Sequence, residues 1–269
     1  MFTTRLLTPK DIDNGIFKAV YSHFENAFIP DERRGIKDLE FTDADGKRII
    51  RGLETLVKEQ KLENSNVSFL CTFSGESEKE ILNNPHEAFR AGSLFYIFPA
   101  TNFVFVEYLF SAKEHMGKGY GMMLLVKRAL KDYIKPAGVK RAFAEVEREG
   151  DFSNPTERKI AEERLKLFER LGGLPLLADY VQPNYSPEKK PVPLHPLLLN
   201  FDGEKNISNT EFINFMKAFY HDIYGLQTPN HQYITHIIDS IKGHEFVEQR
   251  ESRYSKDLHL GLKQLFLER

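Results

Sequence analysis

The chain has 269 residues, of which 41% are hydrophobic and 28% are charged, and its formal net charge is −2. This composition is typical of a globular protein, and the lack of a basic excess or a long basic run argues against nucleic acid as a partner. No apolar run reaches the length of a membrane span or a secretion signal, so we expect a cytoplasmic protein with no membrane partner. The single cysteine, Cys71, cannot form an internal disulfide. We interpret it as a buried small side chain, with a nucleophile as the alternative.

The first hundred residues predict helices and strands in alternation. A short strand at 5–7 precedes a helix over 11–28, and apolar residues at helical spacing predict a second helix from about residue 43 to 57. Strands are expected over 66–73 and 93–98. Residues 99–102 then predict a hairpin turn into a third strand.

Residues 103–135 predict a buried strand, a glycine-rich loop and a helix. The loop consists of Met116, Gly117, Lys118, Gly119, Tyr120 and Gly121. Unpaired N–H groups at a helix start, approached closely because glycine has no Cβ, suit a phosphate or pyrophosphate. A tight turn that needs glycine for its geometry alone explains the spacing equally well.

The remaining chain predicts a strand over 141–146, a helix from 154 to 172, and two extended segments over 174–183 and 191–201. Beyond residue 201 only helices are expected: one behind a capping box at Ser208 and Glu211, one over 229–241, and one over 245–267. We therefore expect two domains, residues 1–200 and 201–269. The histidine and carboxylate spacings lack the residues that complete a zinc or calcium motif, so no metal is expected.

This order of elements resembles the GNAT acyltransferase superfamily over about residues 1–200. The loop is similar to the family's acyl-CoA pyrophosphate signature R/Q-x-x-G-x-G/A, with Gly119 and Gly121 at its small positions and Met116 where Arg or Gln is usual. The strings EYL (107–109), EVE (145–147) and DYVQP (179–183) resemble a bacterial GNAT subgroup of unassigned substrate. The resemblance implies an α/β (α+β) fold: a mixed, mostly antiparallel sheet flanked by helices, here with a helical C-terminal appendage.

The resemblance also implies an activity, the transfer of an acetyl group from acetyl-CoA to an amine by direct attack in a ternary complex. The loop from Met116 to Gly121 would bind the pyrophosphate. The backbone of Leu109, Phe110 and Ser111 would polarise the thioester carbonyl. The acceptor would be a small-molecule or peptide amine, and acidic residues near the site favour a cationic one.

Three glutamates are candidates for contact with that amine. Glu107 lies in an otherwise apolar strand, and Glu145 and Glu147 share one face of the next strand. We expect Glu107 or Glu145 to be the general base and Glu147 to bind the acceptor. The alternative is ion pairing with basic side chains such as Arg158 or Arg164.

The general acid is expected to be Tyr180, because Phe168 stands where the family often has its tyrosine. An aromatic that only packs on the core is an equally good interpretation of Tyr180. Gln182 could hydrogen-bond the acceptor.

Two other functions stay open. Met116 and Phe168 both lack an expected polar group, which favours a non-catalytic acyl-CoA-binding or interaction module on the same fold. Residues 203–269 could instead form a unit for partner binding or homodimerisation.

Overall fold

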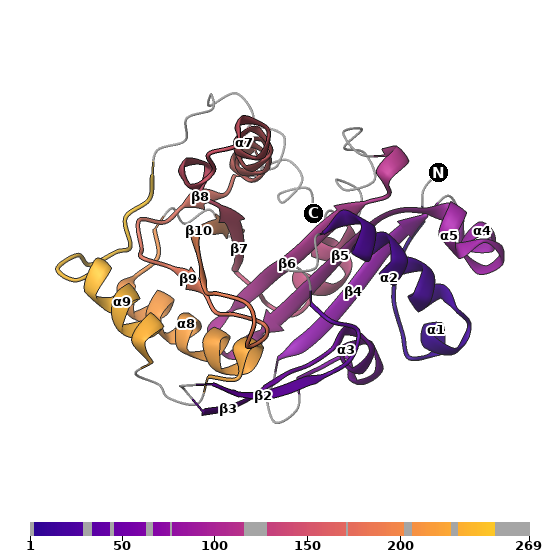
Figure 1. Cartoon of the computed structure of the whole chain (residues 1–269), viewed down its shortest axis with the longest axis horizontal. Helices are drawn as coiled ribbons and strands as arrows, with labels where there is room; N and C mark the ends of the chain where they lie inside the picture. Colours follow the sequence, from indigo (N-terminus) through magenta and orange to yellow (C-terminus); the bar gives the residue numbers. More distant parts are fainter. Residues whose placement is uncertain are drawn as a thin grey trace. The chain divides into compact units, whose positions relative to one another are not determined.

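The computed structural model describes residues 3–28, 34–43, 46–62, 67–75, 77–115, 128–170, 172–201, 206–226 and 231–250 (Figure 1). The chain forms two compact units. The first unit contains Met1–Phe41 and Ile49–Val139, and the second contains Thr42–Arg48 and Lys140–Arg269. The domain boundary expected at residue 200 stays a prediction.

The first unit is built on four antiparallel strands. In spatial order they are β1 (Thr3–Leu6), β4 (Ser68–Gly75), β5 (Phe89–Phe98) and β6 (Phe103–Ser111). A 3₁₀ turn, η1 (Pro99–Thr101), joins β5 to β6, and Asn102 takes the left-handed conformation at φ 59°. The predicted hairpin is therefore confirmed, and β5 begins four residues earlier than its sequence pattern predicts.

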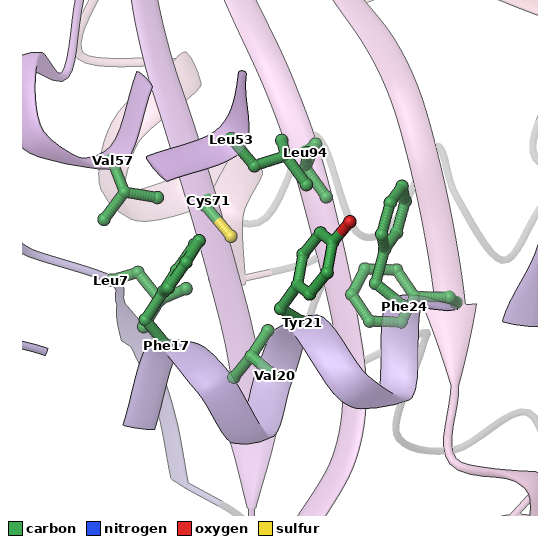
Figure 2. A pocket seen from close by; sticks show the side chains of 10 residues that line it. Leu7, Phe17, Val20, Tyr21, Phe24, Leu53, Val57, Cys71 and Leu94 are labelled. Carbon is green, nitrogen blue, oxygen red and sulfur yellow. The ribbon is translucent and has the colours of Figure 1, made fainter. Parts of the chain in front are cut away.

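The described helices of this unit are α1 (Lys10–Asp13), α2 (Ile16–Ala27), α3 (Leu53–Glu59), α4 (Glu78–Asn83) and α5 (Pro85–Ala88). Helices α2 and α3 pack against the sheet through apolar side chains. Figure 2 shows the sulfur of Cys71 among side chains of α2 and α3, which line an apolar pocket. Burial raises the pKa of the Cys71 thiol well above its usual range. A thiol with a raised pKa is a poor nucleophile, which supports the interpretation of Cys71 as a packing residue.

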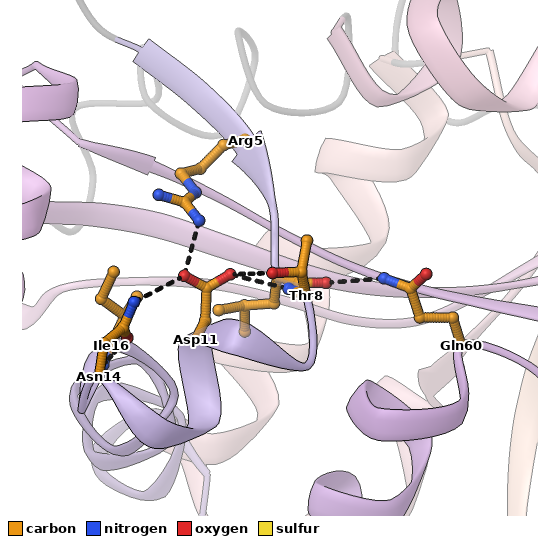
Figure 3. Close-up of polar contacts among 7 residues, drawn as sticks. Arg5, Thr8, Asp11, Asn14, Ile16 and Gln60 are labelled. Atoms are coloured by element: carbon orange, nitrogen blue, oxygen red, sulfur yellow. Dashed lines mark hydrogen bonds and ion pairs between the residues drawn. The ribbon is translucent and has the colours of Figure 1, made fainter.

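The single helix expected over 11–28 is divided into α1 and α2 because Gly15 takes a left-handed conformation at φ 82°. Asp11, the first residue of that predicted helix, is completely buried. Its carboxylate accepts hydrogen bonds from the Thr8 N–H (2.8 Å) and the Thr8 hydroxyl (2.9 Å), and it pairs with Arg5 at 2.6 Å (Figure 3). Asp11 thus fastens β1 to the turn that follows it.

The helix predicted over about 43–57 is wrong in its first half. Residues there form a two-stranded hairpin of β2 (Leu39–Asp43) and β3 (Gly46–Ile50), and α3 begins only at Leu53. Gly46, at φ 115°, follows an aspartate in the sequence, and an Asp-Gly pair favours a tight hairpin turn. Ile49 and Ile50 are β-branched and suit a strand.

The region after β6 is described only in part. A 3₁₀ turn, η2 (Lys113–His115), follows the strand, and a π-helical turn, η3 (Leu130–Ile134), precedes Gly138 at φ 73°. The predicted glycine loop from Met116 to Gly121 lies outside the described residues, as does the first part of the predicted helix behind it, residues 122–127.

The second unit contains further strands, paired in antiparallel fashion, and helices. Its strands are β7 (Arg141–Glu147), β10 (Val192–Asn200) and β8 (Leu174–Pro175) in spatial order, with β9 (Val181–Gln182) also paired to β10. Its helices are α7 (Pro155–Arg170), α8 (Asn209–Tyr224) and α9 (Gln232–Ser240), with a 3₁₀ turn η4 (Glu149–Asp151). No described helix of either unit is long and apolar enough to cross a bilayer.

Helix α8 packs on β7 through aromatic rings. The Phe143 ring lies 5.3 Å from the rings of Phe215 and Phe219. The predicted N-cap is confirmed, because the Ser208 hydroxyl accepts from the Glu211 N–H at 3.2 Å. The Glu211 side chain, however, pairs with Arg141. The segment expected to be a separate appendage therefore shares an aromatic core with β7.

The helix predicted from residue 245 is wrong over its described part. The Val247 N–H donates to the Ile207 carbonyl at 3.0 Å, and the Leu177 N–H donates to the Glu248 carbonyl at 2.8 Å. Extended pairing with these remote segments replaces the local helical bonds. The rest of that predicted helix lies outside the described residues.

Candidate functional site

A polar cluster in the second unit brings together three of the residues expected to act in the site. Glu145, half-buried on β7, accepts a hydrogen bond from the Tyr180 hydroxyl on Oε1 and one from Gln182 Nε2, at 2.9 Å, on Oε2. The strand pairing produces this arrangement, since β10 pairs with β7 and also with β9, which contains Gln182. Two donors from one segment therefore fix the orientation of the carboxylate.

The aromatic environment of this cluster is tightly packed. Tyr180 is completely buried, its ring stacks on Tyr220 with centroids 6.0 Å apart, and Phe143 meets it edge-on at 5.6 Å. The Tyr220 hydroxyl donates to the Val181 carbonyl at 2.8 Å. Burial, followed by the charge of Glu145, raises the pKa of Tyr220 well above its usual value. Because these buried aromatic rings exclude water, the local dielectric constant is low and the charge of Glu145 interacts more strongly with its neighbours.

Such a carboxylate suits proton transfer. Tyr180 and Gln182 fix its direction without neutralising its charge. An oriented carboxylate beside a buried aromatic wall can receive a proton from an ammonium or from a water molecule. The buried position of Tyr180 matches an orienting role, and its expected role as the acid stays a prediction.

Glu147 lies two residues beyond Glu145 on β7 and forms an ion pair with Arg164 of α7. Ion pairing with Arg164 was the structural alternative for this residue, and the contact is present. Arg158, the other suggested partner, donates to the Phe152 carbonyl at 2.8 Å. The role of Glu147 in acceptor binding stays a prediction.

Glu107 in the first unit is also ion-paired. Its side chain is 2% exposed, and its Oε1 accepts from Arg34 Nε at 3.0 Å and from Arg34 Nη2 at 2.7 Å. Sequence reasoning missed Arg34, because it belongs to the charged string DERR, which predicts a solvated loop. Nothing in the local pattern marks this arginine as buried. The role of Glu107 as a base stays a prediction.

The residues expected to hold acyl-CoA are described only at the end of β6. Leu109, Phe110 and Ser111 pair with Ser93, Gly92 and Ala91 of β5. Phe110 is buried, whereas Leu109 and Ser111 are half-buried. The remaining residues of the expected cofactor site, Met116, Gly117, Lys118, Gly119, Tyr120 and Gly121, lie outside the described part of the chain.

A buried histidine lies close to the turn that follows β6. His23 of α2 stacks on Phe89 with ring centroids 4.4 Å apart, and its Nε2 donates to the His86 carbonyl at 2.8 Å. Burial is the largest cause that lowers the pKa of His23, while the His86 carbonyl and the charge of Glu114 partly oppose it. In the described ranges, no cluster of three or more histidine, cysteine or acidic side chains could hold a metal ion.

The lowered pKa of His23 predicts a pH dependence of stability. As the pH falls, this histidine in the unfolded chain, with a pKa near 6.5, takes up a proton before His23 in the folded chain does. The stability that is present above pH 6.5 is therefore lost as the pH falls from there through the lower pKa of the folded state. We expect His23→Gln, which can retain a donor to His86, to flatten the decline in unfolding free energy between about pH 7 and 5. The decline should not vanish, because burial also lowers the pKa of His195. Urea denaturation across this pH range measures the slope.

The exposed His236 of α9 provides the matched control. His236→Gln should leave the slope unchanged. An equal slope in wild type and His23→Gln would contradict the assignment of the pH dependence to His23.

Comparison with known proteins supports the fold. No family model matches the sequence, and no curated protein does. A solved structure from Bacteroides thetaiotaomicron, assigned to the GNAT acetyltransferase family, has a TM-score of 0.53 and 16% identity, and the match covers 84% of this chain and 99% of that one.

Other solved structures match with TM-scores below 0.5, among them two that are described as N-acetyltransferases. The ribosomal-protein-S18-alanine N-acetyltransferase of Escherichia coli has a TM-score of 0.42 and 14% identity, over 74% of this chain and 94% of that one. A variant of the spermidine N-acetyltransferase of Vibrio cholerae has a TM-score of 0.44 and 15% identity, over 74% of this chain and 93% of that one.

The chain therefore has a GNAT fold, and the expected fold class is confirmed. It is a mixed α/β structure with a mostly antiparallel sheet flanked by helices, like the Bacteroides protein. At 16% identity the likeness concerns the fold, and the chemistry has to be argued from the residues of this chain.

Proposed function

We propose that this protein is an acyl-CoA-dependent N-acyltransferase that transfers an acetyl group from acetyl-CoA to an amine. The observation that carries the proposal is the Glu145 carboxylate, oriented by Tyr180 and Gln182 within a chain of GNAT fold. All three residues had been expected to act in the site from the sequence. They come from segments more than 30 residues apart, which the fold brings into direct contact.

The proposed reaction is a direct transfer. The amine nitrogen forms a bond to the thioester carbonyl carbon, the carbon–sulfur bond breaks, and the products are an amide and the free thiol of CoA. The acceptor must lose one proton to become nucleophilic, and Glu145 is the group that we propose receives it, directly or through water. Backbone N–H groups of Leu109 to Ser111 are proposed to stabilise the negative charge that develops on the carbonyl oxygen.

The acceptor is proposed to be a cationic amine, either a small molecule or a peptide amine. The charge of Glu145 would favour a positively charged partner. Glu147 on the same strand is proposed to bind the acceptor in exchange for its ion pair with Arg164. Cys71 is a free, buried thiol, which fits the reducing cytoplasm that we propose as the location. A homodimer formed through residues 203–269 is a further proposal, which light scattering of a chain truncated near residue 201 would test.

The cofactor part of the proposal depends on the glycine loop and has its own test. We expect Gly119→Ala to weaken CoA binding by about tenfold or more, because a Cβ would keep the backbone amides from the pyrophosphate. Isothermal titration calorimetry with CoA measures this change. Gly150→Ala is the matched control, since a Cβ at Gly150 would meet open space. Equal CoA affinity in wild type and Gly119→Ala would contradict the assignment of the loop.

One observation favours a second function, a non-catalytic acyl-CoA-binding module. Glu107 and Glu147 are both engaged in ion pairs with arginines of the chain. Phe168 also replaces the tyrosine often found in the family. A protein that binds CoA with a well-defined affinity but acylates no amine in a broad panel would support this module.

A further inference from the structure

Strand β6 contains a β-bulge at Glu107. Leu94 of β5 pairs with Tyr108, yet the next residue, Phe95, pairs with Val106, so Glu107 is the extra residue. Leu94 and Tyr96 share one face of β5 because they are two residues apart. Their partners on β6, Tyr108 and Phe105, are three residues apart and can share that face only because of the bulge.

The bulge determines which way the end of β6 faces. Beyond it, Tyr108 and Phe110 pack on Phe24 of α2, with ring centroids 4.9 Å and 5.5 Å away. Without the extra residue, alternation from Phe105 would turn Tyr108 and Phe110 away from α2 and turn Leu109 and Ser111 towards it. The bulge therefore decides which side chains at the end of β6 face α2 and which face away from it. This strand end contains Leu109 to Ser111, the residues that we propose polarise the carbonyl.

A buried arginine is attached to this bulge. Besides its two bonds to Glu107, Arg34 donates from Nη1 to the Arg51 carbonyl at 2.8 Å and lies 5.7 Å from the centroid of the Tyr96 ring. Burial raises the pKa of Tyr96, and the charge of Arg34 opposes that rise, so the phenol lies in the field of the ion pair. The guanidinium thus contacts the bulge, an aromatic ring of the neighbouring strand β5 and a second segment at the same time.

That second segment is itself well anchored. The N–H groups of Leu53 and Glu54, at the start of α3, donate to the carbonyls of Gly35 and Ile36 at 3.0 and 3.1 Å. The Gly52 N–H donates to Asp38 at 2.7 Å, and a Cβ at Gly52 would collide with the Lys37 backbone. Arg34 consequently joins the bulge to the fixed N-terminus of a helix.

We infer that Arg34 is a positioning residue, which clamps Glu107 and thereby fixes the bulge and the orientation of Leu109 to Ser111. A buried ion pair contributes little net stability compared with apolar packing, but removal of one partner leaves an uncompensated charge and frees the register. In this account the Glu107 carboxylate belongs to the clamp, and Glu145 is the base. The effect of this inference on catalysis rests on the proposed function. The effect of Arg34 on the stability of the β6 hydrogen bonds can be measured whether or not the protein has that activity.

The first test is hydrogen exchange followed by mass spectrometry on peptides that cover β6 and β4. Arg34→Met should accelerate exchange of the amides of residues 104–111 by about tenfold or more while the β4 peptides change little. Arg51→Met is the matched control, because it removes a surface ion pair with Asp38 and keeps the backbone carbonyl that Arg34 binds. Unchanged exchange in β6 would overturn the clamp. Arg34→Lys, which keeps the charge, serves if Arg34→Met fails to fold.

The second test is kinetic and separates the clamp from a base. Arg34→Met and Glu107→Gln should each lower kcat by about 10- to 100-fold, and the double variant should be no worse than the more impaired single variant. The acidic limb of the pH profile should persist in Glu107→Gln. Additive effects in the double variant would overturn the inference, because they would show that Arg34 and Glu107 act independently. Loss of the acidic limb in Glu107→Gln would also overturn it and would identify Glu107 as the base. A wild-type protein that acylates no amine would refute the proposed function. The hydrogen-exchange measurement would still show whether Arg34 fixes strand β6.

Discussion

Replacement of Glu145 by Gln is expected to lower kcat for acyl transfer by about 100- to 10,000-fold, the usual contribution of a positioned general base. Gln keeps the size of the side chain and an oxygen that can accept from Tyr180, but it cannot take a proton from the acceptor. The KM for acetyl-CoA should change little, because the proposed contact is with the amine. The measurement is the steady-state rate of CoA thiol release as a function of pH.

The Tyr180→Phe variant distinguishes two roles for Tyr180, orientation of the Glu145 carboxylate and general acid catalysis. Removing one hydrogen bond to a charged group should lower kcat by about 10- to 100-fold if Tyr180 orients Glu145. The alkaline limb of the pH profile should then persist, whereas its disappearance would identify Tyr180 as the general acid. Tyr220→Phe is the matched control, since its hydroxyl bonds the Val181 carbonyl and belongs to the same aromatic stack. Full activity in Glu145→Gln would contradict the assigned role of the cluster.

Arg48→Met is expected to destabilise the second unit by about 3 kcal/mol or more, a large part of the stability of a typical domain. The Arg48 guanidinium is buried and donates to the Tyr224 carbonyl at 2.8 Å, to Asn184 Oδ1 at 2.9 Å and to the Asn184 carbonyl at 2.8 Å. Tyr224 is the last residue of α8, where a cation also complements the helix dipole. Methionine fills much of the same volume but leaves these acceptors without their donor.

Urea denaturation followed by circular dichroism tests this prediction. Lys47→Met, one residue earlier on the exposed side of β3, is the control and should change the unfolding free energy by less than about 0.5 kcal/mol. Similar unfolding midpoints for the two variants would show that the buried arginine does not anchor the hairpin. A loss confined to Arg48→Met would explain why residues 42–48 belong to the second unit.

The sequence predicts the central strands well for a simple reason. Strand β6 is a run of apolar and β-branched residues, and in β7 the apolar Ala142, Ala144 and Val146 alternate with the other side chains. Both patterns identify a strand without knowledge of its partners. The contact of Glu145 with Tyr180 could be expected only through the family resemblance, because 35 residues separate them. Once the fold pairs β10 with both β7 and β9, that contact follows.

The features that the sequence did not reveal depend on remote partners. Arg34 and Glu107 are 73 residues apart, and a one-residue bulge leaves no sign in the alternation of an apolar strand. The hairpin over 39–50 was hidden because its apolar residues also fit helical spacing. The extended segment at 245–250 is held by bonds to residues near 176 and 207, which local propensity cannot predict.

The central claim is acyl transfer from CoA to an amine, and one measurement tests it most directly. The purified 269-residue chain would be incubated with isotopically labelled acetyl-CoA and a panel of amines: polyamines, amino sugars and peptides with free amino groups. Mass spectrometry would then follow the label. We predict an acetylated amine and one equivalent of free CoA for each transfer, with both signals strongly reduced in Glu145→Gln. Saturable CoA binding with no labelled amine, or equal transfer by wild type and Glu145→Gln, would contradict the account.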